Sequence, residues 1–164
     1  MRCSLRHAQG NVLFDTGCHP GGRRQIRSAL GQTRATVMTP IMPPGEHVVN
    51  GLTGDRLSTD DIDVVVCSHL HPDHCGCNAF FKRATVIIHE KEIAAARAPD
   101  AETIGLSRAE WDLPVKIDAI GGERDLFGDG RIVLIPLPGH TPGTTGALGR
   151  SSRRAACSFC RPTP

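Results

Sequence analysis

The chain has 164 residues, of which 39% are hydrophobic and 22% are charged, and its formal net charge is +2. This length and composition predict one soluble globular domain and argue against wholesale disorder. No apolar stretch approaches the roughly 20 residues that cross a bilayer, so we expect no membrane partner. The basic N-terminus lacks an apolar region behind it, which favours a cytoplasmic location. The basic excess comes from four arginines in residues 149–164 and is no evidence for a nucleic-acid partner.

The first half of the chain contains two expected strands. Residues 10–14 are apolar and end at the turn sequence Asp15-Thr16-Gly17. Residues 63–67 are rich in β-branched side chains, which is typical of a strand covered on both faces. Short helices are expected in residues 23–30 and after Ser58, which fits a helix N-cap with Asp61 three residues later.

The second half alternates helices and strands. Pro72 fits the first turn of a helix over residues 72–82. A buried strand is expected over 84–89, a helix over 90–98, and a partly helical excursion outside the sheet over 100–114. Residues 125–140 indicate a hairpin around Gly128-Asp129-Gly130, and 143–148 resemble the beginning of another strand. The alternation predicts a layered α/β fold.

A cluster of histidines stands at the end of the strand expected over 63–67. His69 and His71 are two residues apart, and in extended backbone such side chains project to one side, about 7 Å apart along the chain. Both imidazoles can therefore reach one ion at about 2.1 Å. Pro72 then turns the chain, so Asp73 and His74 leave in another direction and could serve a second ion about 3.5–4 Å away. Imidazole and carboxylate ligands suit zinc, with iron, manganese or cobalt as alternatives.

Other residues are weaker candidates for ligands. His140 lies in a second strand-to-loop turn; alone it is as much a turn residue as a ligand, but the first cluster favours the ligand. Cys75 and Cys77 could bind metal, although packing at a helix start is the favoured interpretation. Cys157 and Cys160 form a lone C-x-x-C, whereas a zinc ribbon needs four ligands. The remaining histidines have no candidate ligand beside them in the sequence. We expect surface or packing roles for His7, His47 and His89, whereas His19, which follows the Asp15 turn, could approach the rim of the site.

These motifs carry a family resemblance. The sequence HLHPDH at 69–74, followed about 65 residues later by PGHTPGT at 138–144, resembles the metallo-β-lactamase superfamily. The flanking VLFDTG (12–17) and SHLHPDHCGCNAFF (68–81) look most like its N-acyl-homoserine lactonase branch. The resemblance covers residues 9–148.

The resemblance implies a fold and a site. The fold would be an αββα sandwich in residues 1–148. His69, His71 and His140 would bind one zinc ion, and Asp73 and His74 the other. Asp73 would also act in catalysis by passing a proton onward, whereas Asp15 would belong to a structural turn below the site. The substrate would be a small lactone or ester.

The sequence also departs from the family's pattern. The family has a later strand that ends in a metal-bridging Asp, then a last His ligand, and its lactonases use a Tyr. No acidic residue follows Asp129, no histidine follows His140, and the chain has no Tyr. We therefore expect the second half of the sandwich to be incomplete and one or two zinc ions to bind weakly. Residues 149–164 are expected to be a disordered, non-family tail of the kind a frameshift produces, and residues 1–7 to replace a lost first strand.

Three hypotheses for the function follow. The first is hydrolysis of the lactone ring of N-acyl-homoserine lactone quorum signals, impaired by truncation. The second is a non-catalytic metal-binding remnant, or else a glyoxalase II-like thioesterase or another hydrolase of the same fold. The third is an aspartic protease, based on the Asp-Thr-Gly sequence at 15–17. Such enzymes need two of these loops, or a dimer of a chain that has one, and only one is present here.

Overall fold

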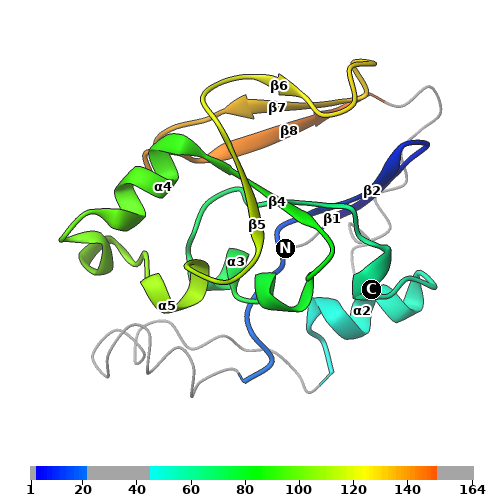
Figure 1. The fold of residues 1–164 in the computed structure, drawn as a ribbon, viewed down its shortest axis with the longest axis horizontal. Helices are drawn as coiled ribbons and strands as arrows, with labels where there is room; N and C mark the ends of the chain where they lie inside the picture. Colours follow the sequence, from blue (N-terminus) through cyan, green and yellow to red (C-terminus); the bar gives the residue numbers. More distant parts are fainter. Residues whose placement is uncertain (1–2, 22–44, 151–164) are drawn as a thin grey trace, which may run out of the picture.

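The computed structural model describes residues 3–21 and 45–150, which form two β-sheets with helices around them (Figure 1). The larger sheet has the order β1-β2-β3-β4-β5, and the smaller one β6-β7-β8. In the larger sheet β1 is antiparallel to β2, while β2 to β5 are parallel. The strands are β1 (Cys3–His7), β2 (Gly10–Phe14), β3 (Val64–Val66), β4 (Thr85–His89), β5 (Lys116–Ile120), β6 (Arg124–Asp125), β7 (Ile132–Pro136) and β8 (Thr145–Gly149).

The helices are short and mostly connect the parallel strands. The α-helices are α2 (Val48–Gly54), α3 (Pro72–Cys75), α4 (Glu90–Arg97) and α5 (Arg108–Trp111). Three 3-10 helices are η1 (Thr59–Asp61), η2 (Asn78–Phe80) and η3 (Ala101–Ile104). In the described residues no helix is both long enough and apolar enough to cross a membrane.

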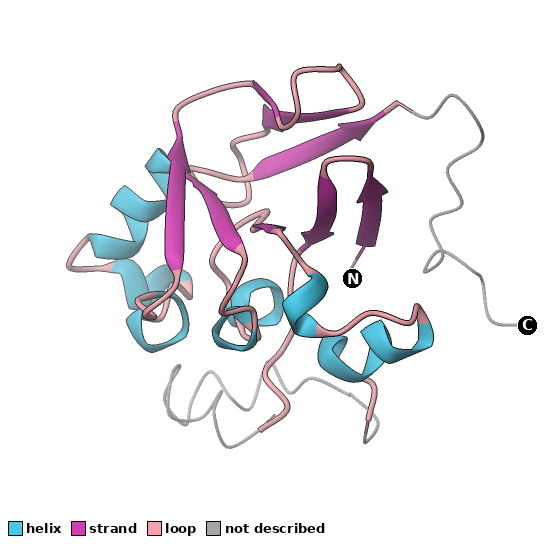
Figure 2. Ribbon diagram, turned by 45° about the vertical axis from the view of Figure 1, so that its right-hand side comes forward, coloured by secondary structure: helices cyan, strands magenta, loops and turns pink. Residues whose placement is uncertain are grey.

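The larger sheet is the middle layer of the molecule. Because successive side chains of a strand point to opposite faces, Val65 faces the helices and Val66 faces the smaller sheet. Both valines are fully buried, as expected for a strand covered on both sides. Leu52, Phe81 and Trp111 fill the helix side. The helices α2, α3 and α5 and the smaller sheet accordingly lie on opposite sides of the larger sheet (Figure 2).

Most elements expected from the sequence are present. The α/β class is confirmed, as are strands in the segments 10–14, 63–67 and 84–89. The helix after His89 and the hairpin around residues 128–130 are confirmed too. A capping box joins Ser58 and Asp61 at the start of η1. The helix expected over 23–30, residues 151–164 and the Cys157–Cys160 pair lie outside the described residues.

Three segments differ from the sequence analysis. The helix expected over 72–82 is broken: α3 ends at Cys75, and η2 follows. A side chain at Gly76 would come within 3.0 Å of the carbonyl of Gly17, because the chain approaches the 17–19 turn closely there. Residues 116–120 form β5, which the analysis missed. Residues 3–7 form β1, an edge strand along β2.

Candidate metal centre

The histidine cluster lies at the carboxyl end of β3. The strand ends at Val66, and Ser68 leads the chain out of the sheet. His71 is the N-cap of α3 in extended backbone, and Pro72 occupies the first turn, where its missing N–H is tolerated. His140 comes from the loop between β7 and β8. The two sheets therefore contribute to one site.

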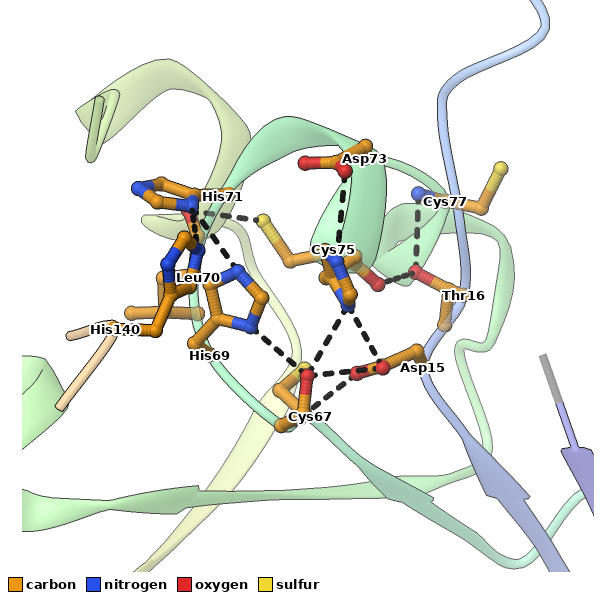
Figure 3. Close-up of polar contacts among 12 residues, drawn as sticks. Asp15, Thr16, Cys67, His69, Leu70, His71, Asp73, Cys75, Cys77 and His140 are labelled. Atoms are coloured by element: carbon orange, nitrogen blue, oxygen red, sulfur yellow. Dashed lines mark hydrogen bonds and ion pairs between the residues drawn. The ribbon is translucent and has the colours of Figure 1, made fainter. Parts of the chain in front are cut away.

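Three imidazoles converge on one point (Figure 3). His71 Nδ1 lies 3.0 Å from His69 Nε2 and 3.1 Å from His140 Nε2. The ligand atoms of the three residues all lie within 4.8 Å of one another. In a tetrahedral zinc site, nitrogens about 2.1 Å from the ion lie about 3.4 Å apart. The donor set therefore fits a zinc-like ion in both spacing and chemistry.

For His69 and His71, the hydrogen bond on the far side of the ring fixes which nitrogen faces this point. His71 Nε2 lies 2.8 Å from the carbonyl oxygen of Ile104, and because a carbonyl only accepts, Nε2 carries the proton. This leaves Nδ1 of His71 with a lone pair for an ion. His69 Nδ1 lies 2.9 Å from Ser68 Oγ, which leaves its Nε2 facing the same point. Partners of this kind orient histidine ligands in metal sites.

Electrostatics keep His69 neutral. Burial, followed by the neighbouring rings of His74, His71 and His140, lowers the pKa of His69 to about 3. A metal ligand must be a neutral imidazole, so no proton has to leave this residue when an ion binds near neutral pH.

Asp73 and His74 lie together beside this point. Their Oδ2 and Nε2 atoms are 3.4 Å apart, and His74 Nδ1 is 2.8 Å from Asp15 Oδ2. Burial alone would lower the pKa of His74, but the hydrogen bonds to Asp15 and Asp73 raise it to about 9. The hydrogen bond from His74 in turn lowers the pKa of Asp73 to about 2. Without an ion, a protonated His74 supplies the positive charge between two carboxylates.

Asp15 supports the site from below. It is buried, its φ is 60°, and its carboxylate accepts from the backbone N–H of Ser68 at 2.7 Å and from Ser68 Oγ at 2.9 Å. Asp is one of the few residues that tolerate this left-handed conformation. Among the described residues its polar partners are Ser68 and His74, not a second aspartate, so the aspartic protease hypothesis gains no support.

The other candidates lie away from the site or pack beside it. Cys75 and Cys77 are fully buried in the core, and burial raises the pKa of the Cys75 thiol well above its usual value, so the packing interpretation is confirmed. His89 caps α4 by accepting from the N–H of Lys91. His19 packs against the ring of Phe80.

The sequence analysis missed Glu92. This residue is fully buried in the first turn of α4, and its carboxylate bonds to the backbone of both histidine loops. The available signal was an acidic residue in the alanine-rich segment 90–98. The sequence pattern of this helix alone could not show that the two histidine loops converge on the Glu92 carboxylate.

Comparisons with known proteins agree with this geometry. A family model described as "Metallo-beta-lactamase superfamily" matches residues 4–146. N-acyl homoserine lactonase AiiB from Rhizobium rhizogenes is 41% identical over 98 residues, which are 56% of this chain and 33% of that protein. N-acyl homoserine lactonase AttM from Rhizobium radiobacter is 31% identical over 90% of this chain and 65% of that protein.

Solved structures show the same similarity. An N-acyl homoserine lactone hydrolase with the product N-hexanoyl-L-homoserine bound at its catalytic metal centre matches with a TM-score of 0.73 and 25% identity. That match covers 91% of this chain and 57% of the other. A quorum-quenching N-acyl homoserine lactone hydrolase matches with a TM-score of 0.69 and 27% identity, over 89% of this chain and 54% of the other. The chain thus spans one third to two thirds of the length of these proteins.

Proposed function

The chain belongs to the metallo-β-lactamase superfamily, and on this premise we propose that it is a metal-dependent hydrolase that opens the lactone ring of N-acyl homoserine lactones. The observation that carries the proposal is the convergence of His69, His71 and His140, with Asp73 and His74 beside them. The lactonase relatives support this choice of substrate. A small lactone or ester as the partner and a cytoplasmic location are parts of the same proposal.

The proposed cofactor is zinc. His69, His71 and His140 would hold one ion through the three nitrogens that face one point. Asp73 and His74 would begin a second site, for which the described residues offer these two donors. When bound, ions of this kind lower the pKa of water and polarise a carbonyl oxygen.

The chain's own residues would orient the reactants and move a proton. Asp73 is half exposed, and its low pKa keeps it ionised. Because so low a pKa makes it a weak base, it would accept a proton from the attacking water only when bound ions lower the pKa of that water. In the proposed reaction a bond forms between the water oxygen and the lactone carbonyl carbon, and the ring C–O bond breaks. Asp73 would then deliver the proton to the leaving alkoxide, so that the product carries a free hydroxyl group.

The proposal is tested by replacing one proposed ligand and one histidine outside the site. His71→Ala should abolish tight zinc binding and lactone opening, because it removes one of three convergent nitrogens. His89→Asn is the matched control, since asparagine can accept from the helix N-terminus as His89 does. Metal content by mass spectrometry and ring opening by titration of the released acid measure both effects. Equal loss of zinc in the two variants would contradict the assignment.

A second candidate function is metal binding without catalysis. The observation that favours it is the second pair, Asp73 and His74, because a tight site wants at least three protein donors. Expressed as they stand, the 164 residues should bind one ion tightly and a second weakly. One preparation that holds zinc but opens no lactone would favour this candidate. Hydrolysis of a thioester instead would favour a glyoxalase II-like enzyme.

A further inference from the structure

A buried carboxylate connects the two loops that carry the histidines. Glu92 has 0% of its surface exposed. Its Oε1 accepts from the backbone N–H of Leu70 at 3.0 Å, and its Oε2 accepts from the backbone N–H of Gly143, also at 3.0 Å. Leu70 stands between His69 and His71, and Gly143 follows His140 by three residues. Each carboxylate oxygen therefore holds one histidine loop.

The contact between α4 and the second loop is close. A side chain at Gly143 would overlap the backbone nitrogen and Cα of Glu92, so the loop lies directly on the first turn of the helix. The loop joins β7 and β8, and α4 lies near one end of these strands (Figure 1). Glu92 and its helix thus contact both loops, which are also joined directly by a hydrogen bond of 2.8 Å from the N–H of Thr145 to the carbonyl of Ser68.

A buried acidic side chain needs hydrogen-bond partners, because moving a polar group out of water is costly when it is left unpaired. None of the ion pairs of the described residues involves Glu92. Its two carboxyl oxygens accept from two backbone N–H groups, and the residue lies in the first turn of a helix, where an acidic side chain is favoured. An apolar side chain would fill this space but would leave both N–H groups without an acceptor.

We propose that Glu92 is a positioning residue, which holds the loops of His69–His71 and His140 at the spacing that one metal ion requires. This inference rests on the proposed function, since it assumes that these histidines bind metal. Loss of such a supporting group typically weakens metal affinity by about 10–100-fold.

The experiment compares Glu92→Gln with Glu90→Gln in the 164-residue chain. Glutamine keeps the shape of Glu92 but turns one oxygen into an N–H₂ group, which must face the N–H of Leu70 or of Gly143. Glu90 is exposed on the same helix turn, so its variant controls for the loss of one charge. Zinc affinity is measured by competition with a coloured chelator. We expect a 10–100-fold loss for Glu92→Gln and a change below twofold for Glu90→Gln.

A second readout separates positioning from general stability. Amide hydrogen exchange of the metal-free protein should show faster exchange at Leu70 and Gly143 in Glu92→Gln, with the strands of the larger sheet unchanged. If Glu92→Gln does not fold, Glu92→Asp keeps the charge but shortens its reach, and it should show the same local effect.

The outcomes are distinguishable. A folded Glu92→Gln or Glu92→Asp variant with wild-type zinc affinity and wild-type exchange at both amides would overturn the positioning role. Absence of zinc binding in the wild-type chain would instead overturn the proposed function. In that case the exchange of Leu70 and Gly143 still decides whether Glu92 holds the two loops.

Discussion

At the scale of single residues, the site depends on groups that do not face the point where the three histidines converge. Asp15 accepts from both the N–H and the hydroxyl of Ser68 and orients His74 toward Asp73. The carbonyl of Ile104 fixes the tautomer of His71. The spacing of His69, His71 and His74 was enough to predict a metal site from the sequence. These supporting contacts were not predictable, because they join residues that are far apart in the chain.

Asp15→Asn tests one of these contacts. The amide N–H₂ cannot accept, so either the Ser68 N–H on Oδ1, or both the Ser68 hydroxyl and the His74 ring on Oδ2, lose their acceptor. Each such loss costs about 1–3 kcal/mol, and we expect the free energy of unfolding in urea to fall by that amount. Asparagine tolerates the left-handed backbone at this position, so strain contributes little. An unchanged unfolding midpoint would show that the hydrogen bonds of Asp15 do not stabilise the fold.

At the scale of secondary structure, the excursion between β4 and β5 forms one wall of the site. The 3-10 helix η3 ends at Ile104, and its C-cap, Gly105, has a φ of 87°. A side chain there would meet Cδ2 and Nε2 of the His71 ring at 3.1 Å. The backbone of Ile104 and Gly105 thus fixes the position of His71 from behind.

Gly105→Ala should therefore affect metal binding as well as stability. The left-handed backbone costs a non-glycine residue about 1–2 kcal/mol, and the added methyl group also pushes on His71. Gly128→Ala is the control, because Gly128 has a φ of 76° but nothing within 4 Å of the added carbon. We expect similar losses of unfolding free energy in the two variants, but weaker zinc binding only in Gly105→Ala. Equal zinc affinities of the two variants would show that the His71 ring can move away from the added methyl group.

The elements were predictable to different degrees, for physical reasons. Residues 85–89 are apolar and mostly buried between two layers, and residues 132–136 are apolar although only Ile132 and Leu134 are buried, so both strands could be predicted. Residues 116–120 form an edge strand with exposed Lys116, Ile117 and Ala119, and this weak pattern resembles a loop. The helix over 72–82 was predicted too long because the N–H of Cys77 donates to the hydroxyl of Thr16 instead of continuing the helix, and this tertiary contact is not visible in the local sequence.

At the scale of the whole molecule, the site lies where the two sheets meet. His69 and His71 follow a strand of the larger sheet, whereas His140 lies in the loop that joins two strands of the smaller sheet. The apolar cluster of Val12, Val66, Ile87, Ile132 and Leu134 holds the sheets together beneath the site. An ion bound to all three histidines would add a second connection between the same two layers.

Zinc should therefore stabilise the fold. A ligand that binds only the folded state, at 100 times its Kd, adds about 2.7 kcal/mol. We expect zinc to raise the unfolding temperature of the wild-type chain and a chelator to reverse the rise. In His140→Ala the rise should vanish, while the metal-free stability should change by less than about 0.5 kcal/mol because His140 is exposed. A rise of equal size in this variant would place the zinc elsewhere.

The meeting of distant loops at one point also has a consequence for folding kinetics. His71 and His140 are 69 positions apart, and the entropy lost on closing so long a loop makes their contact a late event. An interaction that is absent from the transition state changes the unfolding rate and leaves the folding rate almost unaltered. In stopped-flow measurements, zinc should therefore slow unfolding and leave the refolding limb of the chevron where it is. Faster refolding with zinc would mean that the two sheets are already in contact in the folding transition state.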